Sequence, residues 1–142
     1  MNLRPMLDGE QHQVRAMLAG AALPVEDLDQ ADVRFIVASD GIETLGAVGL
    51  EVFGSVGLLR SLVVRPEARG SSIGGRLIEA LEAHARGNGL NQLVLLTQTA
   101  APFFARRGYA VIARDAAPAA VQGSAEFRSL CPASATCMTK HL

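Results

Sequence analysis

A short basic, glycine-rich segment is the part of this sequence best suited to bind an anion. It reads Arg-Gly-Ser-Ser-Ile-Gly-Gly-Arg over residues 69–76, between an apolar run and an amphipathic pattern. A glycine-rich loop that opens a helix presents unpaired backbone N–H groups where the helix macrodipole is positive, which suits a phosphate group. The spacing matches neither the P-loop nor the G-x-G-x-x-G dinucleotide fingerprint. The segment therefore predicts a phosphate-binding loop of another kind.

The elements that position this loop are predicted from hydrophobic periodicity and turn residues. Strands are expected over residues 3–6, 34–38, 42–53, 56–64, 93–96, 109–112 and 137–142. Helices are expected over residues 8–19, 72–86 and 100–107, with residues 116–130 irregular or briefly helical. Short turns make the first strands an antiparallel meander, which runs into a β-α-β unit and C-terminal strands. We therefore predict an α/β fold with a mixed sheet and helices on both faces, in one domain over residues 1–142.

Composition narrows the classes of partner. The chain has 142 residues, a formal net charge of −1, one tyrosine, five phenylalanines and no tryptophan. A near-neutral chain with few aromatic residues is not suited to nucleic acid or to an anionic membrane surface. No apolar run is long enough to span a bilayer and the first residues lack a signal-peptide pattern, so we expect a cytoplasmic protein. Cys131 and Cys137 lack metal-ligand spacing, so no metal site is expected.

Two segments resemble the GNAT superfamily of N-acetyltransferases, which bind acetyl-CoA. Residues 69–75 resemble its R/Q-x-x-G-x-G/A pyrophosphate loop, and residues 95–109 resemble a second signature, A-x-x-F-Y-x-x-x-G-F. Phe103, Gly108 and Tyr109 match the second signature, and the predicted order of elements matches the GNAT fold. The resemblance implies a GNAT fold with acetyl-CoA as the cosubstrate.

The resemblance also implies which residues bind CoA. In the GNAT fold the strand before the loop splays from its neighbour and its backbone pairs with the pantetheine arm, which implies Leu62, Val63 and Val64. The loop that wraps the pyrophosphate would comprise Arg69, Gly70, Ser71, Ser72, Ile73, Gly74, Gly75 and Arg76. Ser72 stands where the family usually has glycine; a serine fits there at negative φ and is strained at positive φ. Phe103 and Phe104 are expected beside CoA, with plain core packing as the alternative.

Candidates for catalysis and acceptor binding are few. Glu51 and Ser61 are the candidate catalytic side chains, although a solvent-facing carboxylate is an equally simple interpretation of Glu51. Arg60 interrupts an apolar strand, and because an unpaired buried cation is costly it should face a cleft, a partner or a substrate anion. Strand alternation points Ser61 away from Arg60 unless a bulge intervenes. Phe104 occupies the position of a tyrosine that donates a proton to the CoA thiolate in many family members.

Most of the chain, residues 3–142, is similar to the small arsenic-resistance acetyltransferases of this superfamily, including the segment Glu126–Ala135, which in this fold borders the acceptor pocket. That similarity implies an amino-acid-like organoarsenical acceptor, with its acidic end on Arg60 and Cys131 as a candidate ligand for trivalent arsenic. We expect direct acetyl transfer to a small amine. A CoA-binding module without catalysis and a structural partner domain are the alternatives. An open edge at the last strand predicts a homodimer.

Overall fold

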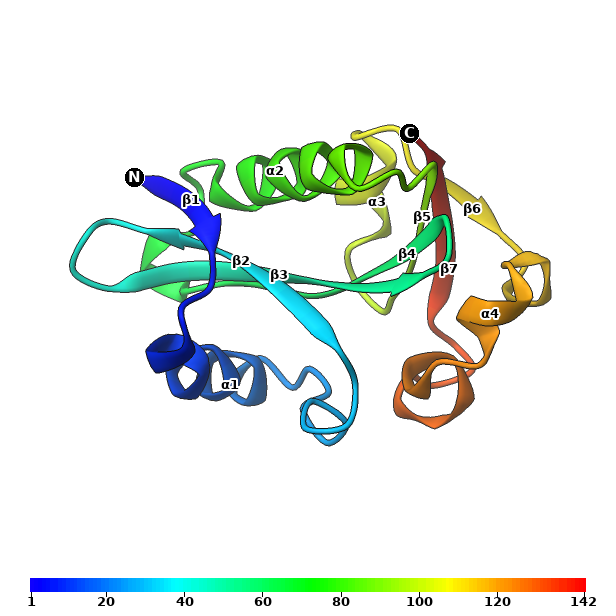
Figure 1. Cartoon of the computed structure of the whole chain (residues 1–142), viewed down its shortest axis with the longest axis horizontal. Coiled ribbons are helices and arrows are strands. Elements are labelled where there is room, and N and C mark those ends of the chain that lie inside the picture. Colours follow the sequence, from blue (N-terminus) through cyan, green and yellow to red (C-terminus); the bar gives the residue numbers. More distant parts are fainter.

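A seven-stranded mixed sheet runs through the computed structural model, which describes all 142 residues (Figure 1). Its strands are β1 (Asn2–Pro5), β2 (Val33–Ser39), β3 (Thr44–Phe53), β4 (Val56–Val64), β5 (Gln92–Thr97), β6 (Ala110–Ile112) and β7 (Thr136–His141). The spatial order is β1-β2-β3-β4-β5-β7-β6, and only the β4–β5 pair is parallel. The predicted meander followed by a β-α-β unit is confirmed.

Helices cover both faces of this sheet, as predicted (Figure 1). The α-helices are α1 (Gln11–Gly20), α2 (Ile73–Gly87), α3 (Ala101–Ala105) and α4 (Ala119–Gln122). Short 3-10 turns occupy Asp8–Glu10, Pro66–Ala68 and Arg114–Ala116, and a π-helical turn spans Glu126–Leu130. Predicted helix 72–86 agrees with α2 to within a residue at each end, whereas predicted helix 8–19 is divided into a 3-10 turn and α1.

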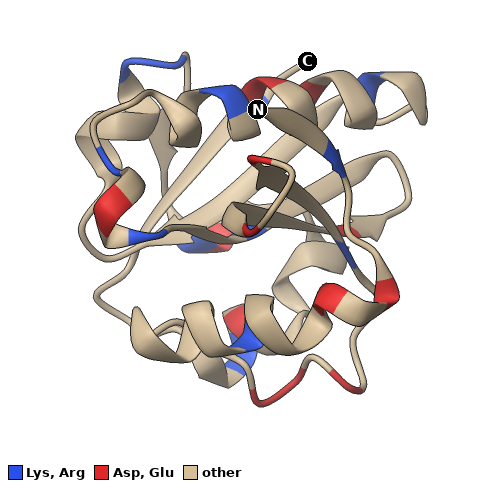
Figure 2. Ribbon diagram, turned by 90° about the vertical axis from the view of Figure 1, so that its left-hand side faces the viewer, with Lys and Arg blue, Asp and Glu red and all other residues tan.

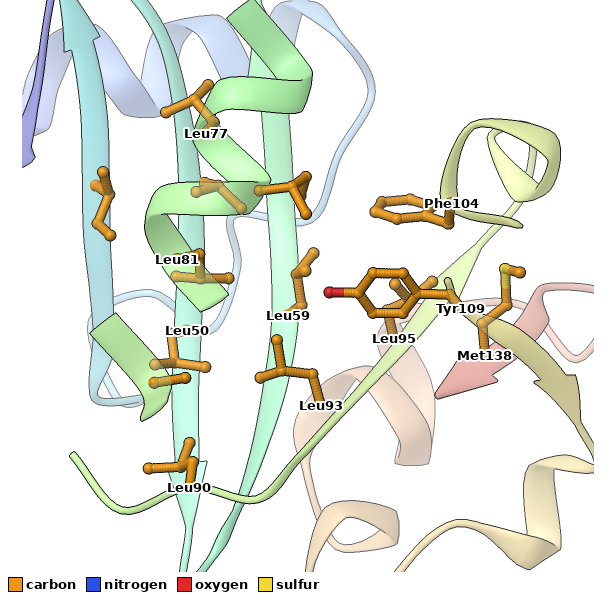
Figure 3. Packing of buried hydrophobic residues seen from close by; sticks show 14 of the residues in the cluster. Leu50, Leu59, Leu77, Leu81, Leu90, Leu93, Leu95, Phe104, Tyr109 and Met138 are labelled. Atoms are coloured by element: carbon orange, nitrogen blue, oxygen red, sulfur yellow. The ribbon is translucent and has the colours of Figure 1, made fainter. Parts of the chain in front are cut away.

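The core divides between the two faces of the sheet. On one face, Leu77 and Leu81 of α2 pack over Leu50, Leu59 and Leu93, since residues three to four apart share one side of a helix (Figure 3). On the other face, one cluster joins α1 to the meander and another joins α4 and the π-helical turn to β4 and β5. Acidic and basic segments both occur on the helices above and below the sheet (Figure 2). No helix is long and apolar enough to cross a membrane.

The last strand does not form an edge of the sheet. Cys137 on β7 pairs with Leu96 on β5 and with Ile112 on β6, so β7 lies between these two strands. The edges are β1 and β6 instead. The expectation of an open edge at β7 is therefore wrong, and the reasoning that led from that edge to a homodimer loses its basis.

Strands β4 and β5 separate after a short stretch of pairing, as the family resemblance implies. They pair only from Val56–Gln92 to Leu58–Val94, and beyond these residues each continues without the other. On its other side β4 pairs with β3, where the register shifts so that Gly49 faces Arg60 and Ala47 faces Val63. The bulge contains Ser61, whose φ is +61°. It turns β4 beside the space that the splay opens.

Candidate active site

Two adjoining spaces flank the splayed part of β4. The inner cavity, of about 330 Å³, lies between residues 59–62 of β4 and residues 95–100 at the end of β5. Residues 21–24, Phe104, Glu126, Cys131 and Ala135 complete its lining. The outer hollow is more open and lies beside the glycine-rich loop, with Arg69, Gly74, Phe103 and Arg106 among its residues. Both spaces touch Ala21, Leu62, Thr99 and Ala100. A ligand bound at the loop can therefore reach the inner cavity past Leu62.

The glycine-rich loop presents a row of free backbone donors. The six N–H groups from Gly70 to Gly75 donate no hydrogen bond within the chain, and the first intrahelical bond of α2 runs from Arg76 N–H to the Ser72 carbonyl at 3.1 Å. The Ser71 hydroxyl stays inside the loop, where it donates to the Ala68 carbonyl at 2.6 Å. Because these donors meet the positive end of the α2 dipole, the loop can hold a pyrophosphate.

Ser72 adopts the left-handed conformation that the sequence left open. Its φ is +65° and its ψ is 18°, and its side chain makes no capping hydrogen bond. A residue with a Cβ atom loses about 1–2 kcal/mol in this region compared with the right-handed one. Gly70 also has a positive φ, +87°, but avoids this cost because glycine has no Cβ atom. The position of Ser72 is thus one that favours glycine, and the serine is strained there.

Backbone alternation decides which groups of β4 face a ligand. Arg65 N–H donates to the Leu45 carbonyl of β3 at 2.8 Å. Since polar backbone groups alternate in direction along a strand, those of Val63 face β3 and those of Leu62 and Val64 face the splayed side. The Val64 carbonyl accepts a bond from Arg69 Nε at 3.3 Å, on the loop side. Of the three residues predicted to pair with pantetheine, Leu62 and Val64 have the suitable direction and Val63 does not.

The two phenylalanines of the second signature lie in different environments. Phe103 lines the outer hollow; a Cβ atom added to Gly74 would lie 3.4 Å from its ring, and the Arg107 guanidinium stacks 3.7 Å from its centroid. Phe104 is buried, lines the inner cavity, and packs edge-on against Tyr109 (Figure 3). Phe104 carries no proton, and Tyr109 donates its hydroxyl to Glu82 at 2.8 Å outside the cavity lining. Neither ring supplies an acid to this cavity.

Arg60 is the centre of a buried charge cluster. Its guanidinium donates to both oxygens of Asp27, at 2.6 and 2.8 Å, and to Glu51 Oε1 at 2.8 Å. Glu126 Oε2 lies 3.3 Å from Arg60 Nε, which also donates to the Ser61 hydroxyl at 3.2 Å. The Arg60 side chain is 0% exposed. Its ionic partners are thus carboxylates of its own chain, and Arg60 is not a free cation for a substrate anion.

Both predicted catalytic residues belong to the same cluster. Glu51 is buried rather than solvent-facing, because its carboxylate is bound to Arg60. Ser61 lies beside Arg60, because the bulge and positive φ of Ser61 remove the strand alternation that would separate the two side chains. Ser61 lines the inner cavity and Glu51 does not.

Glu126 is the only carboxylate that lines the inner cavity. Burial raises the pKa of its carboxyl to about 7, Arg60 opposes this rise, and the charges of Asp27 and Glu51 add to it. Hydrogen bonding to Arg60, by contrast, lowers the pKa of Asp27. Burial and the charge of Glu126 raise the pKa of the neighbouring Cys131 thiol to about 11. Cys131 therefore stays protonated near neutral pH and is a poor nucleophile.

Sequence reasoning missed Asp27 and Glu126 as site residues. A signal for both was present, since a buried Arg60 requires carboxylate partners. The segment Glu126–Ala135 was expected to border the acceptor pocket, and it contributes Glu126, Cys131 and Ala135 to the cavity. What the sequence lacked was a reason to select these two carboxylates among the others.

Comparisons with known proteins agree with this geometry. Residues 31–111 match the family described as acetyltransferase (GNAT) domain, and the chain belongs to that family. Over 77 residues it is 39% identical to an IAA acetyltransferase of Azospirillum brasilense, which covers 53% of the chain and 50% of the relative. Over 64 residues it is 42% identical to an amino-acid acetyltransferase of Pseudomonas putida, which covers 45% of the chain and 15% of the relative. The match thus spans half, or less, of the length of these relatives.

A similar fold occurs in a solved structure with bound CoA. Rv2747 of Mycobacterium tuberculosis, crystallised in complex with CoA, superposes with a TM-score of 0.84 at 23% identity. The superposition covers 100% of this chain and 99% of that one. The predicted GNAT fold is confirmed.

Proposed function

We propose that this chain is an acetyl-CoA-dependent N-acetyltransferase that moves an acetyl group directly to the amine of a small substrate. The observation that carries the proposal is the continuity of the two spaces. An anion-binding loop opens onto the outer hollow, and the same strand that borders this hollow forms a wall of the inner cavity. Such an arrangement brings a thioester and an acceptor together at Leu62.

In this proposal the CoA pyrophosphate binds the N–H groups of Gly70–Gly75, with Arg69 and Arg76 as additional cations. The pantetheine arm follows the free backbone groups of Leu62 and Val64 through the outer hollow. One of these two N–H groups then polarises the thioester carbonyl, which stabilises the negative charge that develops on its oxygen during attack. No side chain of the chain needs to bind the acetyl oxygen.

Direct transfer is the form of catalysis that the side chains support. A covalent acetyl-enzyme requires an activated nucleophile. The Cys131 thiol has a pKa of about 11, and the Ser61 hydroxyl accepts a bond from Arg60 rather than donating to a base. The CoA thiolate leaves without help from Phe104, which is tolerable because thiols have a pKa of about 8.5.

The acceptor that we propose is a small, amino-acid-like amine. A cavity of about 330 Å³ is at the lower end of the sizes that hold small molecules. One relative is named for amino-acid acetylation. An organoarsenical amine remains a finer prediction from the family resemblance, and its acidic end would need a partner other than Arg60, since three carboxylates already surround that guanidinium.

Calorimetry with acetyl-CoA tests the cofactor half of this proposal. We expect micromolar binding by the wild type and its loss in Gly74→Glu, because the new carboxylate would enter the pyrophosphate site and press on Phe103. Gly87→Glu is the matched control: it is in the same helix with open space around it, so binding should persist. The absence of heat with the wild type would overturn the acetyltransferase proposal.

An acceptor screen then separates catalysis from mere CoA binding. The purified protein and acetyl-CoA are mixed with each standard amino acid, with benzylamine and putrescine, and with the arsenical amine arsanilic acid, and released thiol is measured. Acetylation of at least one amine is the expected result. Binding of acetyl-CoA without thiol release in any mixture would favour the alternative, a CoA-binding module that acts through a partner.

A further inference from the structure

The three carboxylates around Arg60 differ in what they can reach. Asp27 makes a two-pronged contact with the guanidinium, and Glu51 accepts a short bond from it. Neither of them lines the inner cavity. Glu126 makes the longest of the ion pairs, at 3.3 Å, and lies in the cavity wall. It is therefore the one carboxylate of the cluster that a molecule bound in the cavity can contact.

The cluster has more acidic than basic groups. One guanidinium faces three carboxylates, and its Nη1 and Nη2 atoms donate to Asp27 and Glu51. An ionised Glu126 thus adds a negative charge that Arg60 neutralises only in part, next to a space with no other cation in its lining. Such a carboxylate gains from a neighbouring ammonium ion, or from a proton.

We propose that Glu126 is a catalytic residue that binds the ammonium group of the acceptor and takes a proton from it before acetyl transfer. This inference rests on the function proposed above and assigns its missing base. A general base must reach the proton that it removes, and Glu126 shares the cavity wall with Leu59–Leu62, beside the expected position of the thioester.

The proton and electron pairs balance in four moves. The acceptor R–NH3+ gives one proton to the Glu126 carboxylate and becomes a neutral amine. Its lone pair forms the N–C bond to the thioester carbon, and the carbonyl pair moves onto oxygen. Return of that pair breaks the C–S bond, so CoA leaves as a thiolate. The positively charged amide nitrogen loses a second proton, which the thiolate takes to become CoA–SH, and Glu126 releases its own proton to water.

The charged groups around Glu126 are consistent with this role. Arg60 faces it from β4, Glu51 from β3 and Asp27 from the segment after α1. On its own side of the cavity it meets the Cys131 thiol, and Arg114 binds the Cys131 carbonyl at 3.2 Å. Burial together with the two other carboxylates outweighs Arg60 and raises the pKa of Glu126 to about 7. A base with this pKa is half ionised near neutral pH and can both accept and release a proton.

The pH dependence of kcat/KM in Glu126→Gln tests the role on an acceptor found in the screen. For the wild type we expect kcat/KM to fall tenfold per pH unit below about pH 7, where Glu126 is protonated. The variant should lose this acidic limb and about 10²–10⁴-fold in kcat, the usual contribution of a general base. CoA affinity should change less than twofold, since the loop is untouched. A variant with near wild-type kcat, or with the limb retained, would overturn the inference.

Glu51→Gln is the matched control, because it removes a carboxylate from the same cluster but not from the cavity wall. A purely structural effect of neutralising the cluster would appear in both variants. We expect Glu51→Gln to keep the acidic limb and to move it to lower pH, since the charge of Glu51 raises the pKa of Glu126. Equal loss of the limb in the two variants would assign the effect to the cluster and contradict a specific role of Glu126.

A measurement without an acceptor keeps the inference separate from the proposed function. The protein is labelled with [δ-13C]glutamate and titrated with CoA present, and the Glu126 signal is assigned by its absence in Glu126→Gln. A midpoint near 7 is expected. A midpoint at the ordinary glutamate value of about 4.3 would overturn the proton-acceptor role, whatever the screen finds. If no amine is acetylated, the proposed function fails even though the titration agrees.

Discussion

The glycine-rich loop and the Arg60 cluster are two ways of handling charge in one site. The loop uses neighbouring residues of a single segment, and its N–H groups from Gly70 to Gly75 stay free. The cluster uses Asp27, Glu51, Arg60 and Glu126 from four segments, and each of the three carboxylates is paired with the Arg60 guanidinium. Unpaired N–H groups on one segment are suited to bind a large anion reversibly. A buried network of paired charges is suited to hold a proton at a defined carboxylate.

The two regions also differ in what a substitution should do. Damage to the exposed part of the loop, residues 69–72, should change ligand affinity and leave the fold intact, because these side chains lie outside the core. Damage to the cluster should change stability first, because a charge left without its partner inside a protein is costly. Three predictions sharpen this contrast, beginning with the largest effect.

Replacement of Arg60 should destabilise the protein more than any change in the loop. In Arg60→Met three buried carboxylates lose their shared cation, and breaking a buried ion pair in this way typically costs about 3–5 kcal/mol. Urea unfolding followed by circular dichroism measures the loss. Arg15→Met is the control, since Arg15 binds only the exposed Asp29 and such surface pairs contribute about 0–1 kcal/mol. Equal losses in the two variants would mean that the cluster contributes no more than a surface pair.

The pH dependence of stability isolates Glu126 within the cluster. Burial raises its pKa from 4.5 to about 7, so the folded protein holds a proton that the unfolded chain has lost between these two pH values. Stability should therefore fall as pH rises from 4.5 to about 7 and level off above that, by about 3 kcal/mol at about 1.4 kcal/mol per pKa unit. Glu126→Gln should lack this decline, which unfolding curves at a series of pH values would measure.

Glu10 provides a control of opposite sign. Its pKa is lowered to about 2, first by the hydrogen bond from Arg4, so its contribution to stability is present above pH 4.5 and disappears as pH falls toward 2. Glu10→Gln should therefore remove stability above pH 4.5 and keep the decline between 4.5 and 7. If Glu126→Gln retained that decline, Glu126 would not be its source.

The sequence predicts a region well when the residues that determine its structure are close together along the chain. The loop, α2 and the β3–β4 hairpin depend on neighbouring residues, so periodicity and turn residues predict them with small errors in their ends. The position of β7 depends on its pairing with β5 on one side and with β6 on the other, and no local sequence pattern indicates these partners. From the sequence alone β7, as the last strand, is predicted to be an edge of the sheet. The structure shows that β6 pairs with its outer side.

The cluster shows the same limit in its side chains. The sequence indicates that Arg60 needs partners, yet Asp27 lies 33 residues away and every carboxylate of the chain is a candidate. The strand rule that separates Arg60 from Ser61 fails because a bulge, set by the pairing of β3 with β4, occurs at that residue. Ser72 is an intermediate case: the family resemblance marks the position, and only the backbone gives its φ of +65°.

Replacement of Ser72 by glycine tests the loop with the smallest expected effect. At φ +65° glycine avoids the penalty of the Cβ atom, so Ser72→Gly should raise the free energy of unfolding by about 1 kcal/mol. Because the serine side chain caps nothing, little is lost with it. Ser71→Gly is the control: this residue has no positive φ and loses its bond to Ala68, so it should destabilise instead. Acetyl-CoA affinity, measured by calorimetry, should hold or improve in Ser72→Gly. A loss of affinity there would mean that the Ser72 hydroxyl binds the cofactor, and that the strain is retained for this contact rather than tolerated.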